Sequence, residues 1–176
     1  MLILINTAAT VATLVVLAAA AIAALVQLSH MRANNQLQVF IDIYNRAQSP
    51  EMQEALDHVL EVPKMLEVDP DYLKRVTAGT QPIRSSPLQL AFLYDELGIA
   101  LRQGLVRPAL MFQLGAVGYR TVRDWQLMSP IIEAVRKRAP NAFLHFEYAA
   151  VKAKQWLDTH PQGDYPRDTP RWNESW

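Results

Sequence analysis

The feature that most constrains this chain is the absence of any charged residue or histidine from residues 1–29, most of which are apolar. A helix that crosses the hydrocarbon core of a bilayer needs about 20 predominantly apolar residues, and Thr7–Val26 supplies that length. A lipid-facing backbone must satisfy its own hydrogen bonds, so a single segment can cross only as a helix. We therefore predict a transmembrane anchor at residues 1–29, in contact with membrane lipid.

Two other kinds of segment share this composition, and residues 1–29 fit each of them less well. A cleaved signal peptide has a basic start and an apolar core of about 7–15 residues, whereas here no basic residue precedes a longer apolar run. A helix of a small soluble domain keeps a polar stripe toward solvent, and this segment has none.

The segment is rich in alanine, and several alanines are spaced four residues apart, such as Ala8 with Ala12 and Ala19 with Ala23. Small residues at this spacing allow two spanning helices to approach closely. A homo-oligomer formed through the span is therefore one expectation, and the simple abundance of alanine is the other explanation.

The charges that flank the segment predict its orientation. Only the initiating amine precedes it, whereas His30, Arg32 and Arg46 follow it. Lys and Arg are enriched on the cytoplasmic side of membrane spans. We expect a single-pass protein of the inner (cytoplasmic) membrane with its C-terminal domain in the cytoplasm.

The rest of the chain has the pattern of helices, with no strand pattern. Apolar residues recur at helical spacing from Leu37 to Tyr44, so the first helix is expected to continue beyond the span. Proline at the first helical position marks further helix starts. These starts predict helices from Pro50 to about Pro63, from Pro70 to about Ala78, from Pro87 to Gly104, from Pro108 to Trp125 and from Pro130 to about Ala139. Asn141 is expected to cap a last helix that ends near Asp158.

The expected fold class is all-α, with one N-terminal transmembrane helix followed by a compact bundle of about five to six helices. Residues 1–29 form the anchor, 30–159 the helical cytoplasmic domain, and 160–176 a polar tail that we expect to be disordered. A loop is expected at residues 79–85, and Gly104 suits the left-handed position that ends a helix. The side chains expected to be largely buried are Leu56, Leu93, Leu97, Leu114 and Trp125.

The chain has few of the residues from which catalytic and cofactor sites are built. It has no cysteine, which excludes disulfides, thiolate catalysis and cysteine-based metal sites. The four histidines are scattered, and no glycine-rich phosphate loop occurs. The 17 acidic and 17 basic residues balance, so the net charge gives no signal for nucleic-acid binding. We predict no catalytic, metal-binding or cofactor-binding residue and no nucleic-acid partner.

An enzyme with an unrecognised helical active site is the alternative function. It would require several ionisable side chains to converge in one pocket. The candidates are Asp95, Glu96, Arg102, Arg120, Arg123 and Glu147. Buried ions are costly unless they are paired, so these side chains are expected either to form matched pairs or to face solvent.

Basic residues are concentrated in the second half of the domain. The densest group is Arg120, Arg123, Arg136, Lys137 and Arg138. This basic group is a candidate contact surface for anionic lipid headgroups or for an acidic partner. The other interpretation is a solvated helix face, in which Arg120 pairs with Asp124 and Lys137 pairs with Glu133 at i,i+4 spacing.

Several segments together resemble a known family. They are NNQLQVFIDIYNRAQSPEMQEAL after the span, LGIALRQGLVRPALMFQLG, the step from Trp125 to Pro130 within TVRDWQLMSPIIEAVRKR, and Phe146-Glu147 within FLHFEYAAVKA. Residues 34–156 thereby resemble a bacterial family of small single-span proteins, domain-of-unknown-function family 4760. The resemblance implies an anchored helical domain. It implies no activity, so no catalytic residue is carried over.

Taken together, the anchor and the helical domain favour a membrane-anchored protein-interaction or scaffold module. Its protein partner is not identified by the sequence. We favour this function over an enzyme because no set of candidate residues has the spacing of a catalytic site.

Overall fold

The structure is a computed structural model that describes residues 2–78, 87–113, 116–161 and 163; for residues 2–12 it describes the backbone only. The predicted loop at 79–85, Leu114 and almost all of the predicted tail lie outside the described residues. The chain divides into two compact units, Met1–Gln38 and Val39–Trp176.

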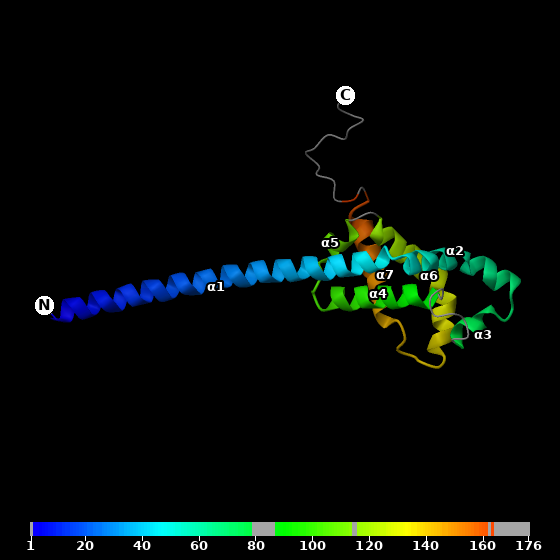
Figure 1. Ribbon diagram of the computed structural model, residues 1–176, viewed down its shortest axis with the longest axis horizontal. Helices are drawn as coiled ribbons and strands as arrows, with labels where there is room; N and C mark the ends of the chain where they lie inside the picture. Colours follow the sequence, from blue (N-terminus) through cyan, green and yellow to red (C-terminus); the bar gives the residue numbers. More distant parts are fainter. Residues whose placement is uncertain (1, 79–86, 114–115, 162, 164–176) are drawn as a thin grey trace, which may run out of the picture. The chain divides into compact units, whose positions relative to one another are not determined.

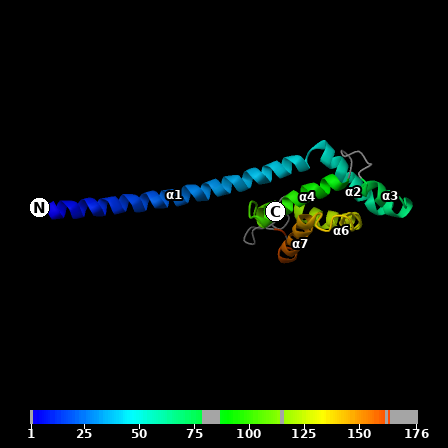
Figure 2. The same ribbon diagram turned by 90° about the horizontal axis from the view of Figure 1, so that it is seen from below.

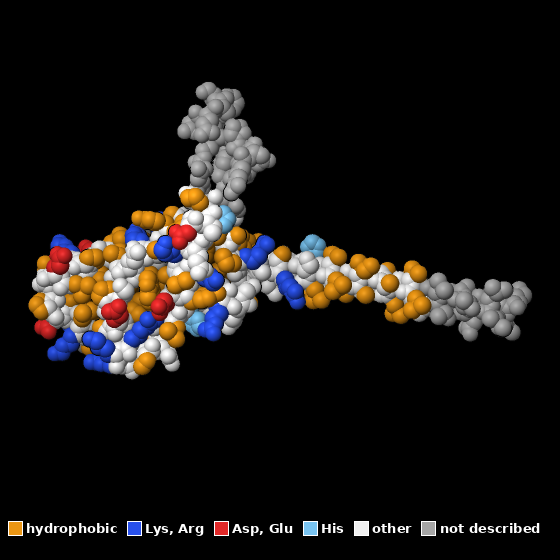
Figure 3. All heavy atoms as spheres, turned by 180° about the vertical axis from the view of Figure 1, so that it is seen from behind, with side chains coloured by type: hydrophobic (Ala, Val, Ile, Leu, Met, Phe, Trp, Pro, Cys, Tyr) orange, Lys and Arg blue, Asp and Glu red, His pale blue; other side chains and the backbone are white. Residues whose placement is uncertain are grey.

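The first helix, α1, runs without interruption from Leu2 to Ala47 (Figure 1). It contains one stretch that is long and apolar enough to cross a membrane, as predicted. Every described side chain from Thr13 to Asn35 is exposed. Figure 3 shows apolar side chains, with no acidic or basic ones, along the part of α1 beside the grey segment. The last turns of α1, from Val39 onward, belong to the second unit.

The second unit is a helical bundle, and the described residues contain no strand, which confirms the all-α prediction. Its helices are α2 (Pro50–Val68), α3 (Tyr72–Thr77), α4 (Pro87–Arg102), α5 (Pro108–Phe112), α6 (Val117–Arg136) and α7 (Leu144–Thr159). Helix α4 packs most extensively on α7 and also on α2, while α6 packs on α7, α2 and α3. In Figure 2, α6 and α7 lie on one side of α4 and the last turns of α1 lie on the other.

The prediction that α2 ends at Pro63 is wrong, because α2 continues to Val68. A proline inside a helix costs about 3 kcal/mol through the lost hydrogen bond and the ring clash. Here the ring of Pro63 is exposed. The residues around it pack with α3 and α6 in a small apolar cluster of Val62, Tyr72, Val76 and Ile131. This burial offsets the cost of the proline.

The prediction that a new helix starts at Pro130 is also wrong, because α6 runs through it to Arg136. Proline cannot donate to the carbonyl four residues earlier, which is that of Gln126. The hydroxyl of Ser129 donates to this carbonyl instead, at 3.0 Å. Met128, Ile131 and Ile132 are fully buried on either side of the proline, so packing holds the helix together.

The predicted single helix from Pro108 to Trp125 is divided into α5 and the first part of α6. Ala116 has φ +66°, a left-handed conformation, directly before α6. Gly118 is buried and faces the side chains of Phe112 and Leu157. Gly118 therefore lets this part of α6 pack against α5 and α7.

The predicted end of α4 is confirmed, whereas the predicted start of α7 is wrong. Gly104 has φ +68° and ends α4, as expected. The amide of Leu105 donates to Ala100 at 2.9 Å and that of Gly104 donates to Leu101 at 3.2 Å, the paired bonds of a Schellman end. At α7 the prediction is wrong: Phe143, with φ +56°, precedes the helix, and Asn141 does not cap it.

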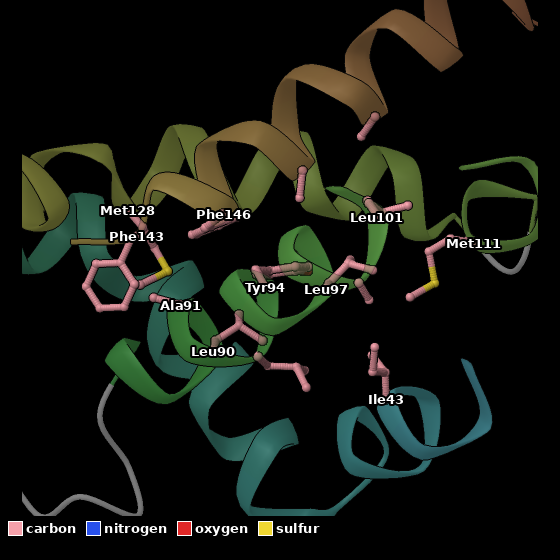
Figure 4. Close-up of a cluster of buried hydrophobic side chains, with 14 of the residues drawn as sticks. Ile43, Leu90, Ala91, Tyr94, Leu97, Leu101, Met111, Met128, Phe143 and Phe146 are labelled. Carbon is pink, nitrogen blue, oxygen red and sulfur yellow. The ribbon is translucent and has the colours of Figure 1, made fainter. Parts of the chain in front are cut away.

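The main core is centred on Phe146, which is fully buried. Its ring stacks on Tyr94 with centroids 4.7 Å apart and meets Trp125 edge-on at 5.1 Å. Leu93 and Leu97 are buried, as predicted. Leu56 and Trp125 are only partly buried at the edge of this core. In Figure 4, the α4 side chains Leu90, Tyr94 and Leu97 lie between Phe146 of α7 and Ile43 of α1.

Candidate functional site

A cavity of about 280 Å³ lies within the second unit, beside α4. One wall is formed by the last turns of α1, including Phe40, Ile43 and Tyr44, and the facing wall by Leu90, Leu93 and Leu97 of α4. Residues from α2, α5 and α6 complete the lining. In Figure 4, the side chain of Ile43 lies between the end of α1 and α4. Most of the lining is apolar.

The two walls are connected by polar contacts. Arg46 at the end of α1 forms an ion pair with Glu96 of α4, and this contact raises the pKa of the Arg46 guanidinium. The side-chain amide of Gln53 on α2 donates to the carbonyl of Ala47 at 2.8 Å. The end of α1 is thus attached to both α2 and α4 while a space stays open between them.

Tyr94 lies between the cavity and Asp124, which is paired with Arg123. It lines the cavity, and its hydroxyl donates to Oδ2 of Asp124 at 2.8 Å. Asp124 is fully buried, and its Oδ1 accepts from Nε of Arg123 at 2.7 Å. Burial, followed by the negative charge of Asp124, raises the pKa of the Tyr94 phenol well above its ordinary value. The phenol therefore stays protonated as a donor at neutral pH.

Arg120 is the cationic residue of the cavity lining, and it is exposed. The predicted i,i+4 pair between Arg120 and Asp124 does not occur among the described contacts. Asp124 instead bonds Tyr94 and Arg123. No described residue forms a hydrogen bond or ion pair with the guanidinium of Arg120, which leaves this charge available at the cavity.

The six charged residues considered for an enzyme are not gathered at one place. Asp95 accepts from the amides of His145 and Phe146, both at 3.0 Å, and so caps the start of α7 from α4. Glu147 pairs with Arg136 at 2.8 Å, and Glu96 pairs with Arg46 on α1. Arg123 bonds Asp124, Arg120 lines the cavity, and Arg102 is exposed near the end of α4.

Three residues of the predicted basic group, Arg120, Arg123 and Arg136, lie along α6, and Lys137 and Arg138 follow its end. Arg120 and Arg136 are separated by about 24 Å along α6 at 1.5 Å per residue. Arg136 donates to the carbonyl of Ala142 at 2.9 Å and lies over the ring of Trp125, so it holds the turn before α7. Lys137 and Arg138 are exposed. Contact between this group and anionic lipid stays a prediction.

Metal ligands do not gather in the part of the chain that the structure describes, where no group of three His, Cys, Asp or Glu residues could hold an ion. The cavity and the burial of Asp124 were not anticipated from the sequence. The signal for Asp124 was available, because Thr121, Asp124, Met128 and Ile131 recur on one helical face. It is visible only when α6 is treated as one helix across Pro130.

Comparison with known proteins identifies one similarity. The family described as Domain of unknown function (DUF4760) matches residues 14–153, which include α1 from residue 14 onward, helices α2 to α6 in full and the first part of α7. This match confirms the resemblance found in the sequence. No curated protein and no solved structure matches the chain.

Proposed function

The chain belongs to the DUF4760 family, a domain of unknown function, and we propose that it is a single-pass membrane protein whose helical domain is a protein-interaction module. In this proposal α1 is inserted in the inner membrane and the domain lies in the cytoplasm. The positive charges at Arg32 and Arg46, on the C-terminal side of the span, support that orientation.

The observation that carries the proposal is the surface of α1. Its large apolar side chains are exposed, for example Leu17 at 60%, Ile22 at 63% and Leu25 at 66%. Apolar surface left in water costs roughly 25 cal/mol per Å². No charge interrupts this surface before His30. A bilayer is the environment that would cover such a helix on all sides.

The role in protein interaction is supported by exposed apolar side chains on α4 and α7. Phe92 is 59% exposed and its ring contacts that of Phe143, with centroids 5.1 Å apart. Leu144 and Val151 lie seven residues apart on one face of α7 and are also exposed. Apolar surface patches of this kind mark contact sites for partners. The enzyme alternative has no comparable support, because its six candidate residues do not converge at one place.

Membrane insertion is tested by extraction of the full-length protein from membranes with alkaline carbonate. We expect the wild type to stay in the membrane pellet. Replacing both Leu17 and Ile22 by lysine should move it to the supernatant, because each central charge opposes insertion by about 2.5–3.5 kcal/mol. A control with alanine at both positions should stay in the pellet. Extraction of the wild type would contradict the proposal.

Orientation is tested with single cysteines, which give clean labelling because the chain has none of its own. Lys154 is exposed on α7, and a Lys154→Cys variant should react with a membrane-impermeant maleimide only after the inner membrane is opened. Labelling in cells with an intact inner membrane would contradict the proposed orientation and place the domain outside the cytoplasm.

Partner contact is tested by a photo-crosslinking amino acid placed at Phe92 and, as a control, at the exposed Gln103. We expect a covalent adduct of one discrete mass from Phe92 and none from Gln103. Equal adducts from both positions, or none from either, would contradict an interaction through this surface.

A further inference from the structure

The cavity beside α4 has the size and lining of a binding site for a narrow apolar group. Its volume of about 280 Å³ is just below the range of roughly 300–1,000 Å³ found for small-molecule sites, which suits a narrow ligand. Leu90 and Leu97 both line it, and they are about 10 Å apart along α4 at 1.5 Å per residue. The space is therefore a short trough between apolar walls.

The trough has a free positive charge. Arg120 lines it, and the acid four residues later in α6, Asp124, is fully buried and bonds Tyr94 and Arg123. The buried acid is therefore not available to neutralise Arg120. A guanidinium presents several donors in a fork that matches a carboxylate or phosphate.

From this combination we propose that the cavity binds one single-chain amphiphile with an anionic headgroup. Its alkyl chain lies in the trough between the end of α1 and α4. Its carboxylate or phosphate accepts hydrogen bonds from the guanidinium of Arg120. This site is separate from the exposed surface around Phe92 and does not depend on the proposed protein partner.

The geometry favours a single chain over the helix of another protein. A helix is about 10–12 Å across with its side chains. Arg46 of α1 is paired with Glu96 of α4, and Gln53 of α2 is bonded to the carbonyl of Ala47. These contacts hold the walls together, so a whole helix could enter only by separating them. An alkyl chain enters without breaking either contact.

The test uses the full-length protein in nanodiscs of zwitterionic phosphatidylcholine. The probe is a fatty acid with a diazirine in the middle of its chain, and its methyl ester is the uncharged control. After illumination, peptide mapping gives the ratio of adducts at cavity residues to adducts in residues 13–29 of the same chain. We expect the acid to label the cavity residues and the ester to label them about tenfold less, because a charge-assisted hydrogen bond is worth a factor of this order.

Two matched arginine substitutions test whether Arg120 supplies the positive charge that binds the headgroup. Arg120→Gln should lower the cavity ratio for the acid by about tenfold, whereas Arg102→Gln, which removes an exposed arginine outside the cavity, should leave it unchanged. Arg120→Lys keeps the charge and should retain most of the labelling. Ala47→Phe, which places a ring in the trough, should abolish labelling of the cavity by acid and ester alike. Circular dichroism of each variant verifies that it is folded.

The outcomes are distinct. Competition by decanoate or by a single-chain phosphate ester would identify the headgroup, and either supports the proposal. Equal labelling by acid and ester, an unchanged ratio in Arg120→Gln, or adducts confined to residues 13–29 would overturn it. Labelled cavity residues without adducts in residues 13–29 would instead count against the membrane span and leave the amphiphile site standing.

Discussion

Helix α4 meets α7 on one side and the end of α1 on the other, and the two contacts differ in kind. Against α7 the backbones touch: a Cβ added at Gly98 would lie 1.8 Å from the carbonyl oxygen of His145. Against α1 the helices leave a cavity of about 280 Å³. The first contact fixes the arrangement of the bundle, and the second leaves room for a ligand beside the same helix.

The largest expected effect comes from Gly98→Ala, which fills the contact between α4 and α7. The obstructing atoms belong to the backbone of His145, so no side-chain rotation can relieve the clash. Overpacking costs typically 1–3 kcal/mol, and we expect about 3 kcal/mol or more here. Chemical denaturation of the second unit measures the change. A loss below about 1 kcal/mol would show that α4 and α7 are not in backbone contact.

The next effect comes from Tyr94→Phe, which removes a hydrogen bond to the buried carboxylate of Asp124. The expected loss is about 1.5–3 kcal/mol, because hydrogen bonds to charged groups are worth this much. Tyr119→Phe is the control, since Tyr119 is 62% exposed, and it should change stability by less than about 0.5 kcal/mol. Equal losses in the two variants would contradict the hydrogen bond between the Tyr94 hydroxyl and the buried Asp124 carboxylate.

The contribution of Tyr94 to the free energy of unfolding should also depend on pH. The pKa of Tyr94 in the folded protein is raised by burial and by Asp124. Its contribution to stability is therefore complete below the unfolded pKa of about 10 and is lost as the pH rises above that value. We expect the stability difference between wild type and Tyr94→Phe to shrink above about pH 10. Tyr72, whose pKa is also raised by burial, is present in both proteins and cancels in the comparison.

A smaller effect is expected at Asp95, which caps α7 across the same contact. Asp95→Ala leaves the amides of His145 and Phe146 without their acceptor, and a lost cap costs about 0.5–2 kcal/mol. Asp95→Asn keeps a side-chain carbonyl oxygen and should recover most of that loss. Thermal unfolding of both variants measures the difference. If asparagine is no better than alanine, the carboxylate does not act as a cap.

The smallest effect is expected on the cavity side. Ala47→Leu adds apolar atoms to an open space rather than to a filled one, so stability should change by less than about 1 kcal/mol and can rise as the cavity is filled. Denaturation alongside Gly98→Ala provides the comparison. A loss as large as that of Gly98→Ala would mean that the α1 side is as closely packed as the α7 side.

The sequence was sufficient for the features that depend on local pattern. The uninterrupted apolar run predicted α1, and Gly104 predicted the end of α4. Helix starts at Pro50, Pro87 and Pro108 are also present. In each case a backbone preference or a hydrophobic period acts within a few residues, and no distant contact opposes it.

Features that depend on distant contacts were missed. Pro63 and Pro130 have the local pattern of a helix boundary, but buried neighbours and the Ser129 hydroxyl carry the helices through them. Because Pro130 has the pattern of a helix start, the buried face of α6 that contains Asp124 was not recognised. Asp95 caps a helix 50 residues away in sequence, which no local spacing reveals. The cavity results from the way five helices meet, so no single segment predicts it.

The difference between the two faces of α4 is tested most directly by hydrogen–deuterium exchange of the full-length protein in nanodiscs. Backbone amides open locally with free energies that follow local packing. We predict slow exchange for the amides of His145 and Phe146 at the α7 contact and faster exchange for Ile43 to Ala47 at the end of α1. Adding decanoate should slow exchange only at the end of α1. Equal protection of both segments, unchanged by decanoate, would contradict the account.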